Sequence, residues 1–147
     1  MVKYLFVHYN LMLLVFFVTK SLGDSEGKYS DYITECKKEY PVTQDDLEQF
    51  LYKKIPDNDT VKCLFACIYK KTGIMDDEGK MSVKGTRKII KRHLADNPAV
   101  MKKAYAFAKA CESVNEEAVS DGTKGCERTA LMFRCSIEKA PKLDILA

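Results

Sequence analysis

Histidine is scarce in this sequence of 147 residues, which contains only His8 and His93. Hydrolysis of the phospholipase type needs a histidine paired with a carboxylate, together with a loop that binds calcium. His93 has no histidine–acid motif around it, and the acidic run at residues 76–79 lacks the alternating acids and later glutamate of an EF-hand. We therefore expect no enzyme activity, and a small secreted hydrolase is the less favoured alternative.

Cysteine pairs with redox or zinc spacing are also missing. A redox motif separates its two cysteines by two residues, whereas three residues separate Cys63 from Cys67. A zinc site uses close pairs of ligands, and His93 is the only histidine outside the N-terminal segment. The sequence therefore predicts neither a metal nor another cofactor.

The N-terminus has the features of a secretory signal peptide. The basic Lys3 precedes an uncharged apolar run at residues 11–18, and Ser21 and Gly23 place small residues at positions −3 and −1 of a cleavage site. This run is too short for a comfortable bilayer span, so an uncleaved membrane anchor is the weaker alternative. We expect residues 1–23 to be removed, leaving one secreted, extracellular domain at residues 24–147.

No large excess of charge of either sign remains in that domain, which carries 22 basic and 21 acidic side chains. Nucleic-acid binding requires a clustered basic face. The one basic cluster has helical spacing, which is typical of a solvated helix face; it consists of Lys84, Arg87, Lys88, Lys91 and Arg92. We therefore expect no nucleic-acid partner.

Strict alternation of apolar and polar residues, the pattern of a half-buried strand, does not occur. Apolar residues instead recur at intervals of three and four, as on one face of a helix. The periodicity and its boundaries predict six helices, at about residues 29–40, 43–55, 58–72, 82–94, 97–111 and 123–139. The predicted fold class is all-α.

Helix boundaries have recognisable signals. Thr43 followed by Asp46 is typical of a capping box, and Asn97 before a proline is typical of a helix start. Gly73 is placed where a left-handed residue ends a helix. Gly85 is an unfavourable residue inside the predicted fourth helix.

The six cysteines predict three disulfides in an exported chain of this size. Cys63 and Cys67 lie on the same face of one helix and run nearly parallel, so each is expected to bond to a different element. Cys126 and Cys135 are nine residues apart and point to opposite sides of the last helix. These constraints leave the pairing open among the fifteen that six cysteines allow.

The cysteine spacing, with gaps of 26, 3, 43, 14 and 8 residues, resembles that of the six-cysteine insect odorant-binding proteins, which include the pheromone-binding proteins. The resemblance covers essentially the whole domain. It implies the pairs Cys36–Cys67, Cys63–Cys126 and Cys111–Cys135, in a compact bundle of six to seven helices around an apolar cavity.

This resemblance also implies a function. A protein of this kind would bind small hydrophobic odorants or pheromones and carry them through sensillum lymph or haemolymph to an olfactory receptor at the dendrite membrane. We expect a monomer or weak homodimer. An extracellular carrier of lipids or hormones outside olfaction is the alternative with the same fold.

Position in the family and the helix faces together indicate ten residues that line the cavity: Tyr69, Ile74, Met81, Ile90, Leu94, Ala104, Ala108, Thr129, Phe133 and Ser136. Tyr69, Thr129 and Ser136 are expected to make polar contacts, because a hydroxyl on an apolar face needs a partner. The C-terminal tail is apolar at Leu143, Ile145 and Leu146, and forms either a lid over the cavity mouth or a frayed end.

Overall fold

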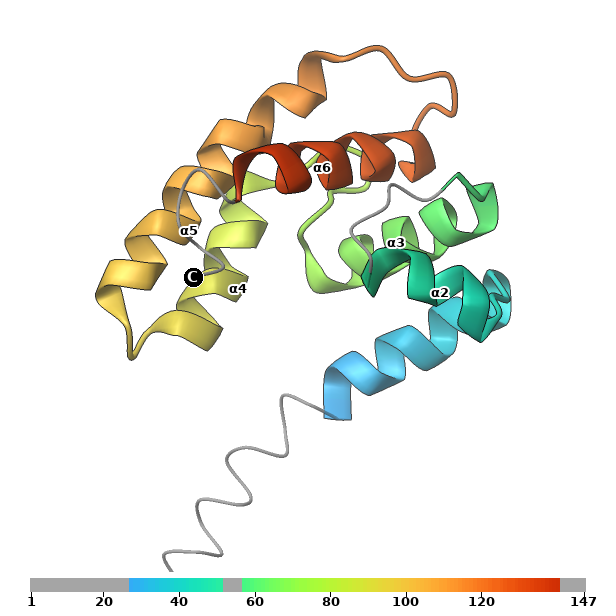
Figure 1. Cartoon of the computed structure of the whole chain (residues 1–147), viewed down its shortest axis with the longest axis horizontal. Coiled ribbons are helices and arrows are strands. Elements are labelled where there is room, and N and C mark those ends of the chain that lie inside the picture. Colours follow the sequence, from blue (N-terminus) through green and yellow to red (C-terminus); the bar gives the residue numbers. More distant parts are fainter. Residues whose placement is uncertain (1–26, 52–56, 141–147) are drawn as a thin grey trace, which may run out of the picture. The chain divides into compact units, whose positions relative to one another are not determined.

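The computed structural model describes residues 27–51 and 57–140 (Figure 1). The chain divides into two units, Met1–Thr34 and Glu35–Ala147. A helix at residues 27–39 begins in the first unit and ends in the second. In the first unit the rings of Tyr29 and Tyr32 pack edge to face with centroids 6.4 Å apart. The predicted signal peptide and its cleavage site lie outside the described residues.

The second unit is helical, as predicted. It contains α2 (Gln44–Leu51), α3 (Asp59–Thr72), α4 (Val83–Leu94), α5 (Pro98–Cys111), the 3₁₀ helix η1 (Glu112–Glu116) and α6 (Cys126–Lys139). Between residues 57 and 140 the only strand-like pairing is one antiparallel bridge, between Met75 and Met81. None of the described helices is long and apolar enough to cross a membrane.

Local signals fix several helix ends. Thr43 and Asp46 form the predicted capping box, in which each side chain accepts a hydrogen bond from the other residue's backbone N–H. The Asn97 side chain accepts from Val100 N at 3.2 Å, with a proline in the first turn of α5. Gly73 ends α3 in the left-handed conformation, with φ of 81°. Because these contacts are local, the sequence predicts them well.

The last helix begins three residues later than predicted. Gly125 precedes α6 with φ of 82° and contributes no side-chain cap, so the helix starts at Cys126 rather than at about Thr123. The segment before it is held by Glu127, whose carboxylate accepts from Ser120 N and Oγ at 2.7 and 2.5 Å. These two bonds lower the pKa of Glu127.

Gly85 inside α4 has a tertiary explanation. A Cβ at this position would lie 1.7 Å from the carbonyl oxygen of Gly73, which belongs to the turn that ends α3. The first turn of α4 therefore approaches that turn more closely than any side chain permits. The residue that weakens the helix locally allows two segments to pack.

The three disulfides have the pairing that the family resemblance implies. Cys36 bonds to Cys67, Cys63 to Cys126 and Cys111 to Cys135, with Cα–Cα distances of 5.8, 4.4 and 5.8 Å. The second bridge links α3 to α6 and the third links α5 to α6. Since α3 packs on α6 and α4 on α5, the bridges connect the two helix pairs through α6 (Figure 1).

One charged side chain is buried in this packing. Arg128 on α6 is only 5% exposed, and its guanidinium donates to the carbonyl oxygens of Val114 and Glu117, the latter at 2.7 Å. Both acceptors lie at the end of η1, where Val114 O also accepts from Glu117 N at 3.4 Å. Arg128 therefore fastens the η1 segment to α6.

Candidate functional site

A cavity of about 170 Å³ lies among α3, α4, α5, α6 and the loop that joins α3 to α4. Most of its wall is apolar side chain. It is lined by Tyr69, Ile74, Met81, Thr86, Phe107, Cys111, Met132 and Ser136. Concave, mostly apolar sites with a few polar groups are the usual form of small-molecule sites, so this cavity is the candidate ligand site.

The wall formed by the loop is held in place by backbone pairing. Ser82 N donates to Ile74 O at 2.7 Å, and Asp76 N donates to Lys80 O at 2.9 Å. The side-chain amide of Asn115, on η1, accepts from Met81 N and donates to Met81 O. The loop therefore presents Ile74 and Met81 to the cavity from a hydrogen-bonded turn.

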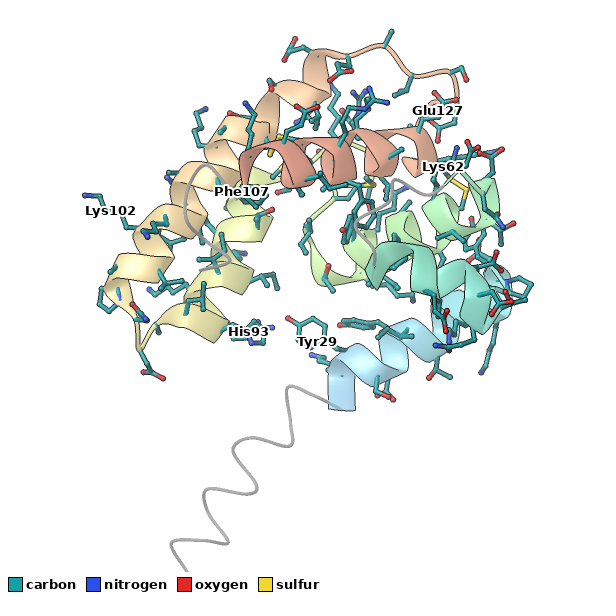
Figure 2. The ribbon with its side chains drawn as sticks, viewed as in Figure 1. Tyr29, Lys62, His93, Lys102, Phe107 and Glu127 are labelled. Carbon is teal, nitrogen blue, oxygen red and sulfur yellow. A yellow bond between two sulfur atoms is a disulfide. The ribbon has the colours of Figure 1, made fainter. Side chains whose placement is uncertain are left out.

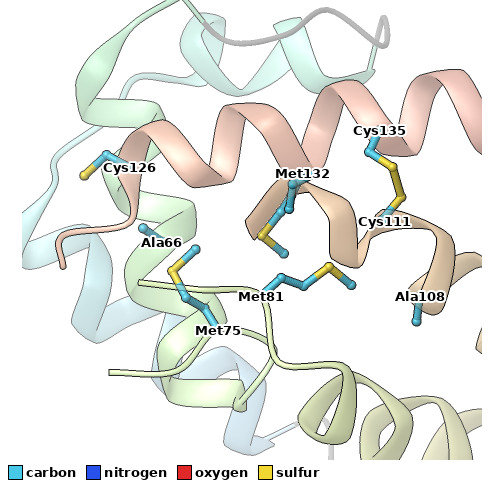
Figure 3. Packing of buried hydrophobic residues seen from close by; sticks show 9 residues of the cluster. Ala66, Met75, Met81, Ala108, Cys111, Cys126, Met132 and Cys135 are labelled. Atoms are coloured by element: carbon cyan, nitrogen blue, oxygen red, sulfur yellow. A yellow bond between two sulfur atoms is a disulfide. The ribbon is translucent and has the colours of Figure 1, made fainter. Parts of the chain in front are cut away.

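Sulfur atoms make up much of the remaining wall. Met132 on α6 lies beside the side chain of Met81, and the Cys111–Cys135 disulfide is close by (Figure 3). Thioether side chains are unbranched and polarizable, and they contact aromatic rings favourably. This part of the cavity can adjust to differently shaped apolar molecules.

Tyr69 lines the cavity from the last turns of α3, in a group of three aromatic rings. The ring of Phe133 lies 6.3 Å from that of Tyr69, and the ring of Phe65 packs edge to face on Phe133 at 5.4 Å. Burial raises the pKa of the Tyr69 hydroxyl to about 12. This hydroxyl therefore stays protonated, and able to donate a hydrogen bond, at every physiological pH.

Three hydroxyl groups belong to residues that line the cavity, and two of them donate within their own surroundings. Thr86 Oγ1 donates to Ser82 O and Ser136 Oγ to Met132 O, both at 2.8 Å. Within the described part of the chain, the Tyr69 hydroxyl donates to no protein acceptor, and it is not among the fully buried atoms that lack a partner, so water or a ligand can reach it. It is thus the hydroxyl whose proton remains for a ligand.

Four of the ten predicted residues line this cavity: Tyr69, Ile74, Met81 and Ser136. The other six are not among the described residues that line it. The Phe133 ring packs against the Tyr69 ring, and Ile90 packs against the buried core. Leu94 is half-buried at the end of α4. Contact with a ligand stays a prediction for every member of the set.

The small residues of α5 and the threonine of α6 belong to the protein interior instead. Ala104 and Ala108 are 6% and 0% exposed, because neighbouring side chains fill the space beside them. Thr129 is fully buried, and its hydroxyl donates to Gly125 O at 2.9 Å. The predicted polar contact at Thr129 is therefore made to the backbone of its own helix.

Four lining residues were missed by the sequence reasoning: Thr86, Phe107, Cys111 and Met132. Phe107, labelled in Figure 2, is next to Ala108 on α5, and Met132 is next to Phe133 on α6. Successive residues of a helix point about 100° apart around its axis. The only signal for Cys111 was its predicted disulfide to the last helix. Neighbouring positions such as these can be separated only once the helices are placed.

A second depression has a different character. It holds about 370 Å³ and is lined by Glu39, Tyr40, Cys63, Cys67, Lys70, Lys71, Thr123 and Lys124. Two of its ammonium groups already have oxygen partners, since Lys70 Nζ lies 2.6 Å from Thr123 O and Lys71 Nζ 2.5 Å from Glu35. A charged, solvated surface of this kind does not suit an apolar ligand.

Two further expectations concern what surrounds the cavity. The predicted lid at Leu143, Ile145 and Leu146 lies outside the described residues and stays a prediction. Among residues 27–51 and 57–140, no three metal-binding side chains come together.

Comparison with known proteins gives a match to one family, described as the PBP/GOBP family, over residues 23–139. General odorant-binding protein 19d of Drosophila melanogaster is 30% identical over 119 residues, which cover 73% of this chain and 78% of that protein. General odorant-binding protein 28a of the same species is 24% identical over 131 residues, covering 88% and 90%.

A solved structure has a similar fold. The odorant-binding protein dmelOBP28a from Drosophila melanogaster superposes with a TM-score of 0.64 at 25% sequence identity. The match covers 84% of this chain and 98% of that one. The similarity therefore extends over nearly the whole of the solved protein.

Proposed function

Because the chain belongs to the PBP/GOBP family, we propose that it is an extracellular carrier that holds small hydrophobic molecules in the cavity beside Tyr69. The observation that carries this proposal is an apolar cavity of about 170 Å³ in a chain cross-linked by three disulfides. An interior space is normally costly, at about 24 cal/mol per Å³ in core-truncation series. Covalent cross-links give a small domain the margin to keep one.

Binding would draw mainly on apolar transfer. Each Å² of apolar surface removed from water contributes about 25 cal/mol, and the few polar groups of the wall would set the orientation of the ligand. Micromolar affinity, about −8 kcal/mol, is the expected range for a ligand of ordinary volatile size.

The cargo would be odorants or pheromones, delivered through sensillum lymph or haemolymph to a receptor at the dendrite membrane. Relatives named as odorant-binding proteins support this role. The protein would act as a monomer or weak homodimer after removal of residues 1–23. Carriage of lipids or hormones outside olfaction would use the same cavity, and the tissue of expression would separate the two roles.

We propose no hydrolase activity. The residue pattern of a nucleophile elbow, Gly-x-Ser-x-Gly, occurs once, at residues 23–27, and spans the predicted cleavage site, so removal of residues 1–23 would take away its first glycine. An elbow places its serine on a sharp turn between a strand and a helix. Residues 27–51 and 57–140 supply no strand for such a turn, apart from the isolated Met75–Met81 bridge.

Equilibrium dialysis would test the proposal directly. The oxidised protein beginning at residue 24 is dialysed against a panel of aryl ketones, terpene alcohols and long-chain fatty acids, with each ligand quantified by gas chromatography. Micromolar retention of at least one class is expected, and reduced and alkylated protein is the control. If the oxidised protein retains nothing beyond this control, the carrier proposal is wrong.

A further inference from the structure

The volume of the cavity limits the size of its occupant. At about 170 Å³, it is close to a dry engineered cavity of about 150 Å³ in another protein that takes up benzene. A space of this size accommodates one ring with a short substituent. The cavity is partly open, so a long alkyl chain would leave most of its methylene groups outside it.

The walls oppose enlargement of this space. On one side the loop is paired through Ser82 N to Ile74 O and through both backbone groups of Met81 to Asn115. On another side the Cys111–Cys135 disulfide joins α5 to α6. These connections are covalent or hydrogen-bonded, so a larger ligand cannot simply separate the two sides.

The polar character of the wall is equally specific. Thr86 and Ser136 use their hydroxyl protons within their own segments, whereas the Tyr69 hydroxyl donates to no described residue. None of the described lining residues carries a charge. A ligand that offers one hydrogen-bond acceptor would satisfy this hydroxyl, and a carboxylate would bring an unpaired charge into an apolar site.

We propose, on the premise that the cavity is the ligand site, that it selects compact neutral molecules of about one substituted ring that carry a single hydrogen-bond acceptor, which Tyr69 recognises. Aryl ketones and aldehydes have this chemistry. The aromatic ring would contact the thioethers of Met81 and Met132, and the carbonyl oxygen would accept from Tyr69.

A homologous series tests the size limit. Isothermal titration calorimetry of alkyl phenyl ketones, from acetophenone upward, is expected to give about a fourfold gain in affinity per added methylene, then a plateau once the cavity is full and further methylenes extend into solvent. A gain that continues undiminished through the long members would overturn the size limit.

Enlarging the cavity should move the plateau. Met132→Ala removes a wall side chain, and the plateau is expected at longer members of the series. Phe107→Leu enlarges the same cavity from α5 and serves where Met132→Ala does not fold. Leu131→Ala truncates a neighbour that packs on the core but does not line the cavity, so its plateau should stay in place. A plateau that stays in place in the folded enlarging variant would contradict the assignment.

A matched ligand pair tests the acceptor. Acetophenone and α-methylstyrene have nearly the same shape, and only the ketone carries an acceptor oxygen. Tyr69→Phe is expected to lower the affinity for acetophenone by roughly 2- to 13-fold, the range of one net hydrogen bond. The affinity for α-methylstyrene should change by less than about twofold. Equal losses for both ligands would show that Tyr69 only shapes the wall.

These results are separable from the proposed function. A protein that retains none of the dialysis panel fails as a carrier. A protein that binds long fatty acids as tightly as aryl ketones remains a carrier, and only the selection proposed here fails.

Discussion

The side-chain amide of Asn115 pairs with both backbone groups of Met81, accepting from its N–H at 2.8 Å and donating to its C=O at 2.9 Å. One side chain thereby takes the place of a neighbouring strand for a single residue. Met81 lines the cavity, so the 3₁₀ helix that carries Asn115 helps to set the shape of the site although Asn115 itself does not line it.

Replacing this amide should weaken both fold and binding. Asn115→Ala leaves two partly buried backbone groups without their partner, which is expected to cost about 1–3 kcal/mol of unfolding free energy. Acetophenone affinity should fall several-fold as the loop loosens. Urea unfolding and calorimetry measure the two effects. Ser113→Ala removes an exposed hydroxyl nearby and should change stability by less than about 0.5 kcal/mol; equal effects of both variants would refute the role given to Asn115.

Two of the disulfides offer a matched comparison. Cys111–Cys135 and Cys36–Cys67 are separated by 24 and 31 residues, so removing either should cost a similar amount, about 3.5 kcal/mol by loop-closure entropy. Cys111 lines the cavity, whereas neither Cys36 nor Cys67 does. Two variants are compared, each with both cysteines of one disulfide replaced by alanine. Thermal unfolding should show similar stabilities for the two, and calorimetry should show the larger loss of ligand affinity in the variant that lacks Cys111–Cys135. The reverse order of affinities would count against this cavity as the site.

Gly85→Ala should destabilise the protein although alanine favours helices by about 1 kcal/mol. Its Cβ would lie 1.7 Å from the Gly73 carbonyl oxygen, and overpacking of this kind costs about 1–3 kcal/mol or more. Gly27→Ala is the control, because a Cβ there meets nothing within 4 Å. Urea unfolding should show a lower midpoint for Gly85→Ala alone. A higher midpoint would mean that α4 does not approach the turn so closely.

Tyr69 should ionise at a higher pH than an ordinary tyrosine. Its pKa is raised by burial from 10.0 to about 12, so the folded protein holds this proton more tightly than the unfolded chain does. The corresponding stability is fully present below about pH 10 and is lost as the pH rises toward 12. In a pH titration, the absorbance of tyrosinate near 295 nm should show one component that ionises at higher pH than the other tyrosines and that is missing in Tyr69→Phe. If the titration curve of Tyr69→Phe instead lacks a component that ionises near pH 10, the Tyr69 hydroxyl is not buried as described.

Ligand affinity should be level between about pH 5 and pH 8. No histidine or carboxylate is among the described residues that line the cavity, and the titratable group among them, Tyr69, is far from its transition in this range. Calorimetry with acetophenone at several pH values would measure this. A change of tenfold or more would place a titrating group in contact with the site, in a part of the chain beyond the lining residues.

The helices could be predicted because their ends depend on neighbours in sequence. Thr43 and Asp46 satisfy each other's backbone, and Asn97 caps the turn that follows it. The pairing of the cysteines could not be predicted from their positions on the helices alone, and was predicted from the family resemblance. The start of α6 was predicted at about Thr123, three residues too early, because Gly125 in the left-handed conformation belongs to the loop before the helix.

The cavity wall could be predicted only in part, because one apolar helix face serves the core and the cavity alike. Ala104 and Ala108 were predicted to leave space for a ligand beside α5, and in the structure neighbouring side chains cover them. Phe133 supports Tyr69 while Met132, one residue before it, lines the cavity. Arg128, a buried cation that binds two carbonyl groups of the η1 segment, has no signature in the sequence. These distinctions depend on long-range packing.

The three disulfides overlap along the chain, since each begins before the previous one closes: 36 to 67, 63 to 126 and 111 to 135. Every peptide bond from Cys36 to Cys135 therefore lies inside at least one covalent ring. A protease that cuts once anywhere in this span leaves the two fragments attached. In a fluid that contains proteases, a nicked molecule would stay in one piece and could keep its cargo.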